Sequence, residues 1–266
     1  LGTEDLAGLD PERSVALLPL GAIEQHGPHL PLVTDTCIAE GLVAETLARI
    51  DDGVSLLVLP TLPVGASAEH LAYAGTLSLG AETLAGTLRD LGASLAASGL
   101  RKLIVLNTHG GNRPGLDGAA LGLRCRHGLF VVKANIAGLG VPEDLFDDEE
   151  LAHGIHGGAV ETSLMLHLRP DLVRMDAAES FDSVSFSLAA EYRYLRPTGR
   201  LAFAWMAQDL NPAGVVGRAS AADAEKGRRL LDHMAGTLAA LAAEAARAPL
   251  DALLRVRSDQ VDLPDP

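Results

Sequence analysis

Four short apolar runs, each followed by a loop of polar or glycine-rich sequence, constrain the fold of this chain more than any other feature. The runs cover residues 15–20, 55–59, 102–106 and 129–134, and helical patterns follow the loops after the first three. Uninterrupted apolar runs are typical of strands buried on both faces, and strands that alternate with helices pair in parallel. The sequence therefore predicts an α/β fold with a mostly parallel central sheet.

Helical spacing of apolar residues predicts the segments that cover this sheet. The expected helices are residues 37–50, 81–98, 114–127 and 221–247, with a further apolar helix that begins near Glu161. Asp35 or Thr36 is available to cap the first of them. In the last helix, the residues expected to face inward are Leu230, Leu231, Met234, Leu238 and Leu241.

Three other segments give weaker patterns. Residues 181–205 carry all of the Phe, Tyr and Trp side chains after residue 150 and are expected to form strands of a flap or interface segment at about 180–212. The acidic run 143–150 is expected to be a solvated face. The tail after Pro249 is expected to be loose or docked on a neighbouring subunit. We expect residues 1–266 to form one domain.

Composition and charge exclude some classes of binding partner. The formal net charge is −14, with a pI near 5.0, and such a field repels nucleic acid and anionic membrane surfaces. Two cysteines, Cys37 and Cys125, are too few for a disulfide framework and favour a reducing compartment, the cytoplasm. Residues 1–12 lack a secretory pattern, and no run approaches ~18 apolar residues, so no membrane association is expected.

The loop after the first apolar run, residues 21–35, carries an unusual set of polar groups. Oxygen and imidazole donors are typical ligands of zinc and manganese, and the carboxyl ends of parallel strands meet at one edge of a sheet. Hydrogen-bonded polar loop residues are the alternative interpretation. Taken together, the loops supply ligands for two divalent metals that share a carboxylate. The candidate ligands are Glu24, His26, Asp35, His109, His156 and Glu161. Since sulfur is absent from this set, Zn or Mn fits best, with Fe as a third candidate.

The other histidines are divided between supporting and peripheral roles. His29 and His70 are equally compatible with orienting the site and with packing. His153 is expected at a surface or gate position. His127 ends a predicted helix, where it would interact with the helix dipole. The histidines expected at partly buried or surface positions of helices are His167 and His233, and Glu69 is expected to order its loop.

Several motifs resemble the creatininase (creatinine amidohydrolase) family over most of the chain, from about residue 15 to residue 241. They are L-P-L-G-A-I-E-Q-H-G-P-H-L-P-L-V-T-D at 18–35, E-H-L-A-Y-A-G-T-L-S-L at 69–79, N-T-H-G-G-N at 107–112 and H-G-G-A-V-E-T-S-L-M-L at 156–166. The resemblance implies a three-layer αβα fold, a dinuclear metal site and hydrolysis of an unusual C–N bond. It also implies ring-shaped homo-oligomers, with a hexamer favoured.

By the same resemblance, Glu24 and His26 would each bind one metal and Asp35 would bridge the two. His109 would complete the first metal's ligands, and His156 would act as the acid/base that protonates the leaving nitrogen. Creatinine-hydrolysing members have Tyr and a ligand Glu after the N-x-H histidine, whereas this chain has Gly110 and Gly111. Glu161 is our candidate for the missing ligand and a further catalytic residue. Residues expected to touch substrate or to support the ligands are His29, His70, Asn107 and Asn112.

The substrate class follows from what the pocket lacks. Creatinine-hydrolysing members carry tryptophans near the H-G-G segment, whereas Ala152 stands near it here and Trp205 is the only tryptophan. The N-x-H-G-G-N form resembles relatives that deformylate a pyrimidine intermediate or trim the C-terminus of a modified redox peptide. The sequence therefore predicts cleavage of a cyclic amide, formamide or modified-peptide amide by a metal-bridging hydroxide.

Other classes of function fit less well. No G-x-S-x-G elbow is present for serine catalysis, and no G-x-G-x-x-G or P-loop motif follows a strand. A non-catalytic metal- or ligand-binding subunit of a homo-oligomeric ring is the remaining alternative, because it would use the same residues.

Overall fold

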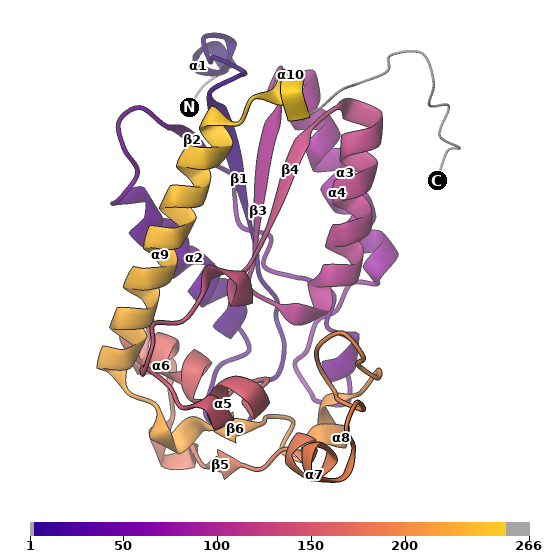
Figure 1. Cartoon of the computed structure of the whole chain (residues 1–266), viewed down its shortest axis with the longest axis vertical. Coiled ribbons are helices and arrows are strands. Elements are labelled where there is room, and N and C mark those ends of the chain that lie inside the picture. Colours follow the sequence, from indigo (N-terminus) through magenta and orange to yellow (C-terminus); the bar gives the residue numbers. More distant parts are fainter. Residues whose placement is uncertain (1–2, 254–266) are drawn as a thin grey trace.

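The computed structural model describes residues 3–253, so the part of the expected tail after residue 253 lies outside it. Four parallel strands form the central sheet: β1 (Ser14–Leu20), β2 (Ser55–Val58), β3 (Lys102–Asn107) and β4 (Phe130–Asn135), in the order β2-β1-β3-β4. The predicted parallel sheet is confirmed (Figure 1). Among the described residues no helix is long and apolar enough to cross a membrane.

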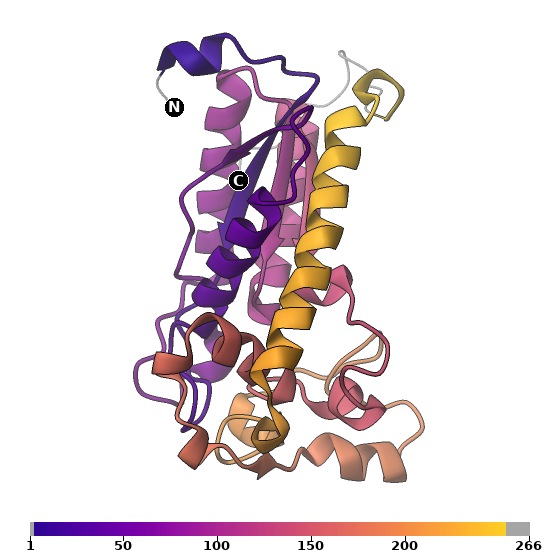
Figure 2. The same cartoon turned by 90° about the vertical axis from the view of Figure 1, so that its left-hand side faces the viewer.

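Both faces of the sheet are covered, as the uninterrupted apolar runs require. Val15 and Leu17 of β1 belong to one core, whereas Ala16 and Leu18 belong to the other. The first core packs against α2 (Thr34–Leu47), α6 (Ala159–Leu168) and α9 (Ala224–Arg247), and the second against α3 (Ala81–Ala97) and α4 (Arg113–His127). Figures 1 and 2 show α9 and the α3–α4 pair on opposite sides of the strands. This arrangement is the expected three-layer αβα fold.

The expected N-cap of α2 is wrong. The helix begins at Thr34, and the cap position is held by Val33, which makes no side-chain capping bond. Thr36 lies in the first turn, where its hydroxyl donates to the Ala22 carbonyl at 3.2 Å. Asp35 is buried and points into the cluster of histidines described below. Both side chains are therefore engaged away from the helix terminus.

The segment between α6 and α9 forms, together with α5 (Asp148–His153), the end of the molecule opposite α1 (Thr3–Ala7) and α10 (Leu250–Leu253) (Figures 1 and 2). The strands expected over 181–205 are wrong there, because α7 (Val184–Glu191) occupies much of that range and is capped by the Ser183 hydroxyl. The other elements of this segment are the two-stranded antiparallel pair β5 (Ser180–Phe181) and β6 (Gly217–Arg218), and α8 (Ala207–Leu210). The remaining described helices, apart from short 3₁₀ turns, are α1 (Thr3–Ala7), α5 (Asp148–His153) and α10 (Leu250–Leu253).

Glu150 departs from the expectation that the acidic run is a solvated face. It is 3% exposed, and its carboxylate accepts hydrogen bonds from the backbone N–H groups of Ala159, at 2.6 Å, and Arg218, at 2.7 Å. Glu150 therefore ties the start of α6 to β6. A run of like charges does not reveal which of its members is turned inward.

Lys102 is expected to contribute strongly to stability. Its Nζ is buried and donates to the carbonyls of Glu12, Ala246 and Ala248, at 2.5, 2.9 and 3.1 Å. Replacing Lys102 with methionine keeps the stem but leaves these acceptors unpaired at the C-terminal end of α9. We expect Lys102→Met to lower the free energy of unfolding by about 2–4 kcal/mol in urea titrations. The exposed pair of Lys133 with Asp117 provides the control: Lys133→Met should cost at most ~1 kcal/mol. Equal effects would contradict this role.

Candidate metal centre

The histidines and carboxylates singled out in the sequence meet at the carboxyl edge of the sheet. Glu24 and His26 lie in the loop after β1, Asp35 in the first turn of α2, and His109 directly after β3. The 3₁₀ turn Ala68–His70 brings in His70, and the turn into α6 brings in His156 and Glu161. Among these seven residues only the side chain of Glu161, at 23%, is substantially exposed.

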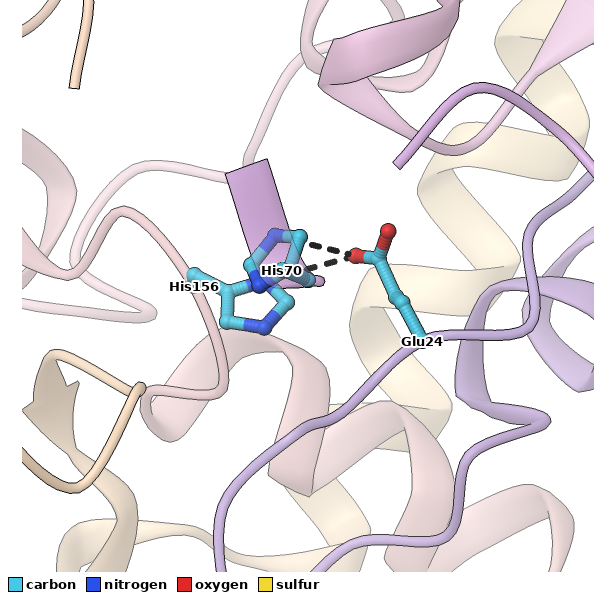
Figure 3. A group of neighbouring side chains, drawn as sticks. All are labelled: Glu24, His70 and His156. Carbon is cyan, nitrogen blue, oxygen red and sulfur yellow. Dashed lines mark ion pairs between the residues drawn. The ribbon is translucent and has the colours of Figure 1, made fainter. Parts of the chain in front are cut away.

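The Glu24 carboxylate is at the centre of this cluster. Its Oε2 lies 3.0 Å from His109 Nε2, and its Oε1 lies 3.5 Å from His70 Nε2 and 3.7 Å from His156 Nδ1 (Figure 3). His26 Nε2 lies 3.9 Å from Glu24 Oε1, 3.7 Å from Asp35 Oδ2 and 4.0 Å from Glu161 Oε2. Apart from the 3.0 Å contact of His109, these separations are at or beyond hydrogen-bond length and suit donor atoms around a shared cation.

Hydrogen bonding supports a metal site. Glu24 Oε1, Asp35 Oδ2 and His26 Nε2 are buried without a hydrogen-bond partner, and Glu24 Oε2 has only the His109 imidazole, at 3.0 Å. Buried carboxylate oxygens without partners are costly, and a divalent cation would satisfy them. Within residues 3–253, ligand atoms within 4.8 Å of one another form three groups: Glu24, Asp35 and His109; His26, His156 and Glu161; and Glu24, His70 and His156. The first two groups share no residue, so the donor set fits two ions.

Hydrogen bonds also fix which nitrogen of His26 and His156 faces the centre. His26 Nδ1 donates to the Glu24 carbonyl at 3.1 Å, which leaves Nε2 as a lone-pair donor toward Asp35. His156 Nε2 donates to the Gln25 carbonyl at 2.8 Å, which leaves Nδ1 toward Glu24. An imidazole whose second nitrogen is tied to a carbonyl is held in the tautomer suited to bind a metal or a proton at the first.

Gln25 sets the tautomer of His70. Its Oε1 accepts from Gly27 N at 3.0 Å and its Nε2 donates to the Gly214 carbonyl at 2.6 Å, so the orientation of the amide is fixed. The same Nε2 lies 2.8 Å from His70 Nδ1, which must therefore accept. Neutral His70 then carries its proton on Nε2, directed at Glu24. His70 is thus positioned to orient the Glu24 carboxylate, a candidate ligand.

Burial and neighbouring charges shift the pKa values of Asp35 and His109 in the centre. Burial raises the pKa of Asp35, and the adjacent Glu24 raises it further. Burial opposes protonation of His109, but the Glu24 carboxylate outweighs it and raises the pKa of His109 to about 10. Without a metal, protons therefore neutralise part of the excess negative charge. Metal binding would displace them.

Asn107 and Asn112 brace the loop that carries His109 rather than facing the ligands. Asn107 Nδ2 donates to the His109 carbonyl at 2.8 Å, and Asn112 Nδ2 donates to Asn107 Oδ1 and to the Gly21 carbonyl, each at 3.0 Å. At Gly111 an added Cβ would lie 2.4 Å from both the Ala66 carbonyl oxygen and Glu69 Oε1. The N-x-H-G-G-N segment is therefore packed so closely at Gly111 that it has no room for a side chain there.

His29 is buried beside the centre and outside all three candidate ligand groups. Its Nε2 lies 2.9 Å from Thr162 Oγ1, and its ring stacks on Phe181 with centroids 5.7 Å apart. His153 bonds to Ser185, with Nδ1 and Oγ 2.7 Å apart, whereas His127 ends α4. The other two peripheral histidines, His167 and His233, are exposed on their helices, as expected.

The titration of His29 gives a prediction for stability. Burial lowers its pKa to about 4, from 6.5. Between pH 4 and pH 6.5 the folded state then binds fewer protons than the unfolded chain. The contribution of neutral His29 to folding stability is therefore complete above pH 6.5 and is lost as the pH falls toward 4. We expect the stability of wild type relative to His29→Gln to fall by roughly 3 kcal/mol over that interval, in urea titrations with chelator present. His167→Gln is the exposed control, and a pH-independent difference for His29→Gln would contradict the assignment.

A cavity of about 340 Å³ opens above the centre. His70, His109 and His156 form part of its wall, and the segment 197–205 forms another part. Two of its residues, Glu69 and Trp205, were not among the expected site residues. Glu69 Oε1 lies 3.5 Å from His109 Nε2, which adjacency to His70 could have suggested. Trp205 offered no such signal, because it is 49 positions from His156 along the chain.

With this geometry established, comparison with known proteins identifies the family. Residues 1–242 match the family model described as creatininase, creatinine amidohydrolase. The chain belongs to the creatininase family. The resemblance noted in the motifs is thereby confirmed.

Creatininase-family relatives of two kinds match the chain. A mycofactocin precursor peptide peptidase from Mycobacterium ulcerans (strain Agy99) is 35% identical over 239 residues, which cover 88% of this chain and 86% of the relative. A creatinine amidohydrolase from Pseudomonas putida is 32% identical over 189 residues, which cover 65% and 71%. Both names denote hydrolases of carbon–nitrogen bonds, which confirms the predicted class of enzyme.

Solved structures of the family share the fold. A Bacteroides fragilis NCTC 9343 protein, provisionally assigned as a creatinine amidohydrolase, aligns with a TM-score of 0.76 at 28% identity over 94% of this chain and 95% of that one. Creatininase in a manganese form aligns with a TM-score of 0.69 at 26% identity over 90% and 92%. A creatininase variant of the Zn–Zn type aligns with a TM-score of 0.69 at 27% identity over 90% and 93%.

Proposed function

We propose that this creatininase-family amidohydrolase uses two divalent ions to cleave a non-standard amide in a modified peptide. The observation that carries the proposal is the pair of carboxylate and imidazole ligand groups beneath an open cavity, in which several buried atoms have no hydrogen-bond partner. The manganese and Zn–Zn forms of creatininase support Mn or Zn as the ions. Cytoplasmic location and a hexameric ring remain predictions from the sequence and the resemblance.

In this proposal Glu24, Asp35 and His109 hold one ion, and His26 and Glu161 hold the other. Asp35 would bridge them, since its Oδ2 lies 3.7 Å from His26 Nε2. Bound ions of this kind supply Lewis acidity that lowers the pKa of water and polarises a carbonyl. Burial of the ligands excludes bulk solvent from the donor atoms, which strengthens their electrostatic effect on the reacting amide.

His156 is the proposed acid that protonates the leaving nitrogen. Its Nε2–H is occupied by the Gln25 carbonyl, so the proton must be exchanged at Nδ1, which faces the centre. The ring also lines the cavity that substrate would enter. His70 is less suited to this role, because its Nδ1 accepts from Gln25 and its Nε2–H is directed at Glu24.

The shape of the cavity favours a substrate larger than creatinine. An added Cβ at Gly110 would meet no atom within 4 Å, so this position leaves room where creatinine-hydrolysing members carry a tyrosine. The mycofactocin precursor peptide peptidase supports a modified peptide as the substrate class.

Glu161 is expected to be a ligand of one ion only. Its Oε2 accepts from Gly157 N at 2.6 Å and lies 4.0 Å from His26 Nε2. Glu161→Gln preserves volume and removes the charge, so we expect it to weaken binding of that ion by at least ~10- to 100-fold, the loss that even supporting residues produce. Calorimetric titration with Mn²⁺ measures both sites separately. Unchanged binding of both ions would exclude Glu161 as a ligand.

Metal-stripped and reloaded protein provide the direct test of function. Chelator-treated chain is supplied with Mn²⁺ or Zn²⁺ and assayed on a panel of modified peptides that carry a non-standard amide, an N-formyl amide, a cyclic amide and creatinine, with acyl-dipeptides as the ordinary-amide control. We expect metal-restored hydrolysis in the modified-peptide arm and little turnover of creatinine. Protein that binds two ions yet leaves every amide intact would instead support the non-catalytic subunit.

A further inference from the structure

A second cavity adjoins the one above the metal centre. It has a volume of about 420 Å³, and it shares four lining residues with the first: Glu69, Gly111, Pro114 and Trp205. We call the cavity above the metal centre the catalytic lobe and the second cavity the apolar lobe. Because the lobes share part of their walls, one bound molecule could occupy both.

The two lobes differ in chemistry. The catalytic lobe contains His70, His109 and His156, together with Arg113. Apart from Glu69, the side chains that line the apolar lobe are hydrocarbon or the indole of Trp205. They include Ala66, Ala68, Leu79, Ala81 and Ala204. Small alanine side chains leave the volume open. A lobe of this size and lining suits a branched or aromatic hydrocarbon group.

Trp205 is fixed at the junction of the lobes. Its Nε1–H donates to the Pro197 carbonyl at 2.8 Å, so the only polar atom of the indole is satisfied. The ring is partly exposed and lines both lobes. A held indole presents a rigid apolar surface to a ligand and loses little conformational entropy when the ligand binds.

Gly111 lies in the wall that the two lobes share. An added Cβ there would lie 2.4 Å from both the Ala66 carbonyl oxygen and Glu69 Oε1, and 2.5 Å from His109 Nε2. A side chain at this position would therefore displace Glu69 or His109 and change the wall between the lobes.

We infer that the apolar lobe is a specificity subsite for a large apolar or aromatic side chain next to the scissile amide. The inference rests on the proposed function, because it places that amide in the catalytic lobe. Burial of such a side chain against Trp205 and the alanine wall should favour its peptide by about 10- to 100-fold over a glycine peptide.

The test measures binding through Trp205, which is the only tryptophan of the chain. Metal-loaded protein is titrated with N-acetyl-glycyl-phenylalanine, N-acetyl-phenylalanyl-glycine and N-acetyl-glycyl-glycine, with selective excitation of tryptophan. We expect one phenylalanine peptide to shift the emission and to bind about 10- to 100-fold more tightly than the glycine peptide. Equal affinities of all three peptides would overturn the inference.

Substitutions that fill the apolar lobe provide a second test of the inference. Ala204 is exposed in an irregular segment, so Ala204→Phe should fill the lobe without disturbing the fold, and Ala81→Phe fills it from the first turn of α3. Both should abolish the phenylalanine preference while metal content stays unchanged. Ala190→Phe, at an exposed position of α7 that lines neither lobe, is the matched control. A preference that survives both filling variants would overturn the inference.

Hydrolysis of the same peptides is scored separately. Turnover without preference for phenylalanine would contradict the subsite and leave the proposed function intact. Preferential binding without turnover of these ordinary amides would support the subsite, and only a further lack of turnover on the modified-peptide panel would count against the proposed function.

Discussion

Asp35→Asn is expected to abolish binding of the metal pair and, at the same time, to leave the metal-free protein at least as stable as wild type. Asp35 is 1% exposed, its Oδ2 has no hydrogen-bond partner, and Glu24 and Glu161 both oppose its ionisation. A neutral amide of the same size removes that repulsion. It also removes the carboxylate proposed to bridge the ions.

Thermal unfolding measures both parts of this prediction. At about 100 times the dissociation constant, a bound ion stabilises by roughly 2.7 kcal/mol, which corresponds to a rise in Tm of about 5–10 °C for a chain of this size. Wild type should show this rise with Mn²⁺ or Zn²⁺, and Asp35→Asn should not. The exposed Asp52→Asn is the control. A variant with the full metal-induced rise would show that Asp35 is no ligand.

The second large effect distinguishes the proposed metal-ligand role of His109 from the proposed acid role of His156. His109→Ala is expected to lose metal and activity together, because His109 Nε2 lies 3.0 Å from Glu24, with which it is proposed to hold one ion. His156→Ala is expected to keep both ions and to lose about 10²- to 10⁴-fold in kcat, the usual contribution of a general acid. Elemental analysis and steady-state kinetics on the same preparations measure the two effects.

This comparison is demanding because His156 Nδ1 also belongs to two of the three candidate ligand groups. If His156→Ala loses metal as fully as His109→Ala, then His156 is a ligand, and another group protonates the leaving nitrogen. The exposed His167→Ala, on α6, controls for the loss of an imidazole away from the centre.

The sheet could be predicted because its signal is local. Each strand is a continuous apolar run, and residues such as Val15 and Ala16 need only be apolar to serve the two cores. The convergence of the loops at one edge then follows from parallel pairing. For this reason the sequence places Glu24 and His109 at one edge of the sheet although they are far apart along the chain.

What could not be predicted depends on contacts between distant segments. Glu150 is buried because Arg218 and Ala159 donate to it, and nothing in the acidic run 143–150 indicates this. The tautomer of His70 depends on a Gln25 amide that is fixed in turn by Gly214. Patterns along the chain describe faces of helices and strands, but they do not specify such long-range partners.

Anomalous diffraction from crystals of the Mn²⁺-loaded protein tests the dinuclear centre most directly. We expect two peaks roughly 3.5–4 Å apart, the separation common in two-metal sites. One should be bound by Glu24, Asp35 and His109, and the other by His26, Asp35 and Glu161. A single peak, or two peaks that Asp35 does not bridge, would contradict this account.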